Sequence, residues 1–148
     1  MLFRSAANRI GSVAFSGGDV TLDAASTYDA TINSTTVNGG TVTFNNAVTM
    51  NNLFSISAGS ATFNANANLV SGATFSGGTT AFNGTTTSLG TGSSVTFSGG
   101  TVTFGDGAGD TITWNGNGTG TLSVSSGTID GLGAFNLIPG NFNWSGGT

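Results

Sequence analysis

The sequence lacks several residue types that proteins commonly use for crosslinks, metal sites and charge. It contains no cysteine, histidine, lysine, glutamate or glutamine among its 148 residues. Without cysteine the chain forms neither disulfide bonds nor thiolate metal sites. Its only basic residues are Arg4 and Arg9 and its formal net charge is −4, so we expect no nucleic-acid partner, because phosphate binding requires clustered cations.

The same scarcity limits catalysis and membrane insertion. Charged residues make up 5% of the chain, none lies between Ala30 and Gly105, and all six acids are Asp. Without a His or Lys base we expect no enzyme activity and no cofactor. No stretch approaches the ~18–20 consecutive apolar residues of a membrane-spanning helix, so we expect no membrane insertion.

What the chain does contain is a repeat. Residues 95–105 read Val-Thr-Phe-Ser-Gly-Gly-Thr-Val-Thr-Phe-Gly, and related segments recur along the sequence. They start at residues 13, 35, 54, 73, 95, 122 and 142, which gives spacings of 22, 19, 19, 22, 27 and 20 residues. Such spacings are typical of one coil of a solenoid.

Each repeat alternates apolar and small polar residues. Positions 1, 3, 8 and 10 are mostly apolar, which predicts strands with one buried face. A Gly-Gly pair between the two halves provides a sharp bend. A third apolar pair follows, from Ala30/Ile32 in the first repeat to Phe135/Leu137 in the sixth. The predicted core column consists of Phe15, Phe44, Phe63, Phe75, Phe82, Phe97 and Phe104.

We therefore predict an all-β, single-domain parallel β-helix, or β-solenoid, over residues 13–148. It would have about six to seven coils of 19–27 residues, with three short strands in each, and the coil length favours a right-handed turn. A sandwich of β-hairpins is the competing fold, because Gly-Gly also suits hairpins, but a sandwich gives no reason for repetition in register. Residues 1–12 place their apolar residues on one helical face, which predicts a short N-terminal cap.

The repeated Ser-Gly-Gly-Thr-Val-Thr-Phe pattern resembles the β-solenoid segments of bacterial surface proteins. It is similar to filamentous-haemagglutinin-like adhesins and to autotransporter-associated β-strand repeats, and the resemblance covers residues 13–148. It implies an extracellular or cell-surface location and a role as stalk, adhesin or filament.

Positions 7 and 9 of the repeat form an outward Thr-x-Thr ladder. This array resembles the threonine lattices of β-solenoid ice-binding proteins, and it offers an alternative function as an ice-binding or glycan-binding surface. Asp19, Ala81 and Asp130 interrupt it, and Thr is also simply a good exposed strand residue. The ladder residues are Thr41, Thr43, Thr62, Thr79, Thr101 and Thr103.

Three other polar features have structural explanations. Position 4 is polar in every repeat and position 11 is Asp or Asn in the first four, so we expect hydrogen bonds along the stack. The Gly-rich loop with Asp106 and Asp110 faintly resembles calcium-binding repeats, but it occurs once and reads as a plain acidic loop.

The C-terminal end of the sequence suggests self-assembly. The chain stops at Thr148, directly after a Gly-Gly bend, so we expect a longer solenoid or a neighbouring subunit to complete the coil. The expected partner is a second copy joined head to tail in a homopolymer, with Phe142, Asn143 and Trp144 at the junction.

Overall fold

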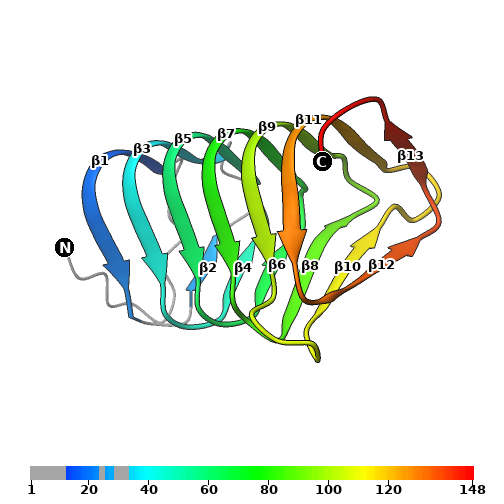
Figure 1. Ribbon diagram of the computed structural model, residues 1–148. Helices are drawn as coiled ribbons and strands as arrows, with labels where there is room; N and C mark the ends of the chain where they lie inside the picture. Colours follow the sequence, from blue (N-terminus) through cyan, green and yellow to red (C-terminus); the bar gives the residue numbers. More distant parts are fainter. Residues whose placement is uncertain (1–12, 24–25, 29–33) are drawn as a thin grey trace.

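The protein is a β-solenoid with two parallel sheets, and the strands of each sheet follow one another along the solenoid axis (Figure 1). The computed structural model describes residues 13–23, 26–28 and 34–148, and every regular element in these ranges is a strand. The helical cap predicted for residues 1–12 lies outside the described residues.

Long strands form a seven-stranded sheet and short strands form a six-stranded sheet. The first sheet has the order β1-β3-β5-β7-β9-β11-β13 and the second has the order β12-β10-β8-β6-β4-β2. The first consists of Val13–Leu22, Ser34–Phe44, Leu53–Phe63, Ala73–Phe82, Val95–Phe104, Thr121–Gly131 and Asn141–Trp144. In chain order, β2, β4, β6, β8, β10 and β12 are Ser26–Tyr28, Val48–Met50, Ala67–Leu69, Thr86–Thr91, Thr111–Asn115 and Ala134–Ile138.

One coil is a long strand followed by a short one, so six coils run from β1–β2 to β11–β12, and β13 begins the next. Neighbouring coils pair equivalent repeat positions: Phe75 lies beside Phe97 and Phe82 beside Phe104. Every strand pair is parallel, which confirms the predicted solenoid and rules out the hairpin sandwich.

The Gly-Gly pairs bend the long strands without ending them. In β9 the second glycine, Gly100, has φ +73°, and a Cβ there would lie 2.6 Å from the Gly78 carbonyl oxygen. Backbone pairing continues on both sides with a shift of register at the bend. Each coil therefore has two hydrogen-bonded strands instead of the expected three, because the first two apolar segments belong to one strand.

The third apolar segment is the short strand of each coil. Val48 and Met50 of β4 are buried, as are Ile112 and Trp114 of β10. In the first coil, β2 pairs Ser26 with Val48 and Tyr28 with Met50. This register corrects the sequence assignment of the third pair in that coil to Ala30/Ile32, which lie outside the described residues.

Aromatic rings stack through the interior. Phe44, Phe63, Phe82 and Phe104 form one column, with centroid distances of 4.7, 4.7 and 5.0 Å and interplanar angles of 5°, 8° and 8°. All seven phenylalanines of the predicted core column are buried. The alternation along each strand thus places the large apolar side chains in one continuous core.

Polar columns hold the corners between the strands. Asn45 donates to the Asp23 carboxylate at 2.6 Å, Asn64 donates to Asn45 at 2.9 Å, and Asn83 donates to Asn64 at 3.0 Å. At position 4, the Ser76 hydroxyl donates to the Ile56 carbonyl oxygen at 3.2 Å. These bonds agree with the structural interpretation of both columns.

Candidate functional site

The β13 edge of the larger sheet carries exposed aromatic side chains. Phe142 pairs with Leu122 and Trp144 with Val124, so both occupy core positions of the repeat. Leu122 and Val124 are buried, whereas Phe142 and Trp144 are each 51% exposed. Two predicted junction aromatics therefore extend the buried columns without being covered themselves.

The short-strand sheet ends at the same side of the molecule. Its outermost strand, β12, pairs with β10 and places Phe135 beside Ile112 and Leu137 beside Trp114. Phe135 and Leu137 are 38% and 50% exposed. Six of the seven large exposed hydrophobics among the described residues belong to this apolar end, which comprises Leu132, Phe135, Leu137, Ile138, Phe142 and Trp144.

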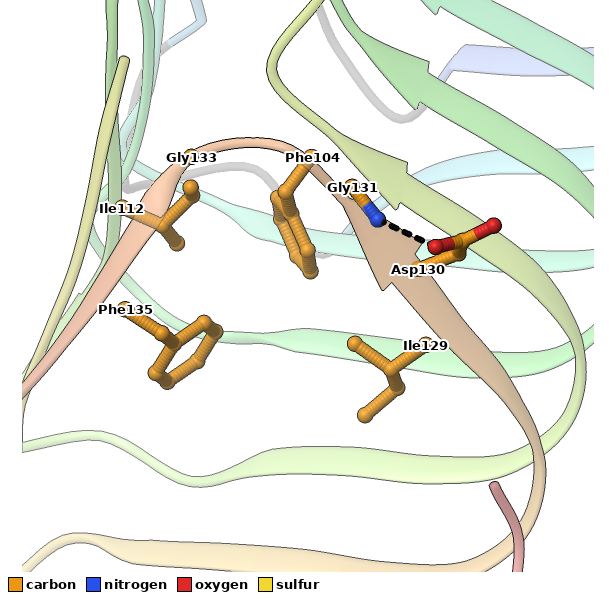
Figure 2. A pocket seen from close by; sticks show the side chains of 7 residues that line it. All are labelled: Phe104, Ile112, Ile129, Asp130, Gly131, Gly133 and Phe135. Carbon is orange, nitrogen blue, oxygen red and sulfur yellow. Dashed lines mark hydrogen bonds between the residues drawn. The ribbon is translucent and has the colours of Figure 1, made fainter. Parts of the chain in front are cut away.

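A hollow of about 210 Å³ opens at the apolar end, between β11 and β12. Figure 2 shows Phe104, Ile129 and Phe135 pointing into it from different sides. The Phe135 ring contacts Phe104 edge-on at a centroid distance of 5.8 Å. The remaining lining residues are Ile112, Asp130, Gly131 and Gly133.

The hollow exists because the phenylalanine column ends at Phe104. The next residue in register is Gly131, which has no side chain to stack. Beside it, Asp130 takes the place of the outward threonine and accepts a hydrogen bond from the Gly131 N–H at 2.8 Å (Figure 2). The sequence interpretation missed this pair. The sixth repeat starts at residue 122, so its position 10 is Gly131. Comparing this position with the phenylalanines of the four preceding repeats would have shown that one ring is absent.

The predicted threonine ladder forms two columns on the outer face of the larger sheet. Thr41 and Thr43 pair with Ser60 and Thr62 of the next coil, and equivalent pairs continue along the stack. Position 7 is Asp19, Thr41, Ser60, Thr79, Thr101 and Thr128, and position 9 is Thr21, Thr43, Thr62, Ala81, Thr103 and Asp130. Side chains two residues apart along a strand are roughly 7 Å apart, and coils repeat every ~4.8 Å. The array is interrupted at Asp19, Ala81 and Asp130, and Ser60 replaces a threonine in the position-7 column.

The acidic loop of the fifth coil is organised by Asp110. Its Oδ2 accepts hydrogen bonds from the backbone N–H groups of Asp106 and Gly107, each at 2.9 Å, and the residue is buried. Asp106 is exposed. This Asp110 carboxylate therefore closes the loop, and the described residues contain no group of three or more His, Cys, Asp or Glu side chains that could hold a metal ion.

Two further observations bear on what kind of protein this is. Among the described residues there is no helix that is long and apolar enough to cross a membrane. Comparison of the chain with protein-family models, with curated proteins and with solved structures finds no match.

Proposed function

We propose that this protein is a non-enzymatic structural rod that joins end to end with further solenoid coils. The product would be a filament, or a segment of a longer surface fibre or adhesin stalk. The observation that carries the proposal is the apolar end, where Phe142 and Trp144 continue buried columns in register but stay half exposed. An unpaired strand edge that also presents apolar side chains is a template for pairing with another strand.

Strand polarity favours head-to-tail joining. Each strand pair is parallel, and β1 and β2 are the outermost strands at the other end of their sheets (Figure 1). Placing β1 of one copy on β13 of another preserves the parallel direction, and such a heterologous contact allows open-ended growth. Phe15 and Leu22 at the β1 end are already buried, so they would gain little burial in the contact. The contact between copies would instead be stabilised by backbone pairing and by burial of the exposed side chains of β12 and β13.

Location is inferred from the repeat pattern. The Ser-Gly-Gly-Thr-Val-Thr-Phe pattern resembles the repeats of bacterial surface proteins. The in-register stack of coils supports a rod of the kind that such proteins use as stalks. We therefore place the protein outside the cell or on its surface. Fractionation of the native host followed by detection with an antibody would test this, and a purely cytosolic signal would contradict it.

A charge at the junction tests the assembly directly. Sedimentation velocity and electron microscopy at rising concentration should show rods that lengthen, and Trp144→Asp should keep the protein monomeric because it buries a carboxylate in the contact. Thr101→Asp is the matched control: it puts the same charge on the outer face, in the column that already holds Asp19. A wild-type protein that stays monomeric at high concentration would reject end-to-end assembly of separate copies.

Proline variants distinguish the edge of β13 that pairs with β11 from the edge that would pair with a neighbouring copy. The N–H groups of Asn141 and Ser145 donate to the carbonyl oxygens of Gly120, which directly precedes β11, and of Val124 in β11. The N–H groups of the alternate residues Phe142 and Trp144 therefore face outward. Phe142→Pro should therefore stop growth while leaving β13 paired, with Phe142→Ala as the control for loss of the ring. The backbone N–H of Asn143, the third junction residue, faces β11 in this alternation. Asn143→Pro should therefore detach β13 from β11 instead.

The threonine ladder supports a second candidate function as an ice-binding or glycan-binding surface. The observation in its favour is the register, which aligns Thr43 with Thr62 and Thr79 with Thr101. If the ladder binds ice, the wild-type protein shows thermal hysteresis, and Thr43→Tyr with Thr101→Tyr abolishes it without altering stability. Absence of hysteresis in the wild type would eliminate ice binding.

A further inference from the structure

The turn between β10 and β11 contains the one residue other than glycine that has a positive φ angle among the described residues. Asn117 has φ +43° and the next residue, Gly118, has φ +75°. The Thr119 N–H donates to the Gly116 carbonyl oxygen at 2.9 Å, so these four residues follow the pattern of a type I′ turn. Asn-Gly is a favoured dipeptide for this turn, which leaves Asn117 exposed.

An Asn-Gly pair places a side-chain carboxamide next to an unobstructed backbone nitrogen. We propose that Asn117 is a site of spontaneous deamidation. The Gly118 nitrogen attacks the Asn117 Cγ and forms a five-membered succinimide, while the Cγ–Nδ2 bond breaks and the displaced proton leaves with the nitrogen as ammonia. Water then opens the ring at either carbonyl, which gives aspartate or isoaspartate. Glycine favours the attack because it has no Cβ and its backbone rotates most freely.

The Asn117 side chain is not held in place. Its backbone N–H donates to the Asn115 Oδ1 at 3.0 Å, but its carboxamide makes no hydrogen bond with another described residue. The Gly118 N–H donates to the Pro139 carbonyl oxygen at 2.8 Å, so this bond must break before the nitrogen attacks. One such bond in an exposed turn is a small obstacle, because loops open at a lower free-energy cost than core strands.

Three other Asn-Gly pairs lie among the described residues, and two of them belong to the regular stack. Asn38 and Gly39 are inside β3, where Asn38 pairs with β5 and Gly39 pairs with β1. The Asn83 amide donates to Asn64 at 3.0 Å, and Gly84 is buried against the backbone of the preceding coil. Attack at either pair therefore requires neighbouring coils to separate.

The remaining pair, Asn115 and Gly116, is held by the same turn. The Asn115 Oδ1 accepts the bond from the Asn117 N–H, and Gly116 is buried against the Trp114 ring. The fold thus confines rapid deamidation to one of four identical dipeptides. The product adds a carboxylate to a chain whose net charge is −4, and isoaspartate adds a backbone carbon that disturbs the contact with Pro139.

The test follows deamidation of the full-length protein at mildly alkaline pH, where the attacking nitrogen loses its proton more readily. Mass spectrometry of chymotryptic peptides assigns each site, since trypsin has only Arg4 and Arg9 at which to cut. Asn117 should react at least about tenfold faster than each other Asn-Gly pair, because the others react only after strands or buried turns open. In the same protein unfolded in urea, the four rates should converge.

Two variants control for the assignment. Asn117→Gly suits the positive φ angle and removes the carboxamide, so the early product should disappear without loss of stability. Gly118→Ala keeps the carboxamide but places a Cβ beside the attacking nitrogen, where no described atom lies within 4 Å, and it should slow the reaction. Equal rates at all four pairs in the folded protein, or an early product that persists in Asn117→Gly, would overturn the inference. Neither result depends on whether the protein forms rods.

Discussion

Thr80 is a polar residue in an apolar column, between Ala61 and Val102. It is 2% exposed, and its Oγ1 has no hydrogen-bond partner among the described residues. A buried hydroxyl without a partner costs stability, whereas an apolar group of the same shape does not. We expect Thr80→Val to stabilise the fold by about 1 kcal/mol, measured by urea unfolding. Thr62→Val, on the outer face, should change little, and a less stable Thr80→Val protein would contradict the prediction.

Gly100 and Gly18 occupy the same bend position in different coils. Comparing them distinguishes the cost of a positive φ angle for alanine from the cost of a Cβ contact with the neighbouring coil. Their φ angles are +73° and +69°, so each disfavours alanine to a similar degree. A Cβ at Gly100 also meets the Gly78 carbonyl oxygen, whereas at Gly18 nothing lies within 4 Å among the described residues. Gly18→Ala should cost about 1 kcal/mol and Gly100→Ala clearly more, by thermal or urea unfolding. Equal losses would show that contact between coils does not constrain the bend.

At the scale of elements, the stack of phenylalanines ties one coil to the next. Phe82 is fully buried and stacks on Phe63 and Phe104, while Phe135 at the apolar end is partly exposed. Phe82→Ala should cost roughly 3–5 kcal/mol because it leaves a cavity in the middle of the column. Phe135→Ala should cost much less. Urea unfolding of both variants measures the difference, and similar losses would mean that stacking does not control stability.

At the scale of the whole molecule, the direction of growth leaves a diffraction signature. Coils are ~4.8 Å apart along the solenoid axis, which is also the direction of hydrogen bonding between strands. Filaments built end to end should therefore give a reflection near ~4.8 Å parallel to the fibre axis when they are aligned. Rods that associate side by side would place this reflection perpendicular to the fibre axis, and that result would contradict head-to-tail joining.

Much of the fold could be predicted from the sequence because a solenoid is built from local repeats. Alternation with period 2 identified which residues face inward, such as Phe63 and Phe82, and the repeat spacing predicted the register. The threonine columns followed from the same spacing. The Gly-Gly bend was also located correctly, although the sequence could not show that backbone pairing continues through it.

The sequence by itself determined the coil: its length, its buried face and its bends, because alternation and glycine conformation depend on residues close together in the chain. The tertiary structure decided what depends on neighbours in space. It placed Ser26–Tyr28 in the first short strand, turned Asp110 toward the backbone of its own loop, and set Gly131 above Phe104. Loop lengths and contacts between coils fix these features, so only the stacked molecule shows where the core is complete and where an end stays exposed.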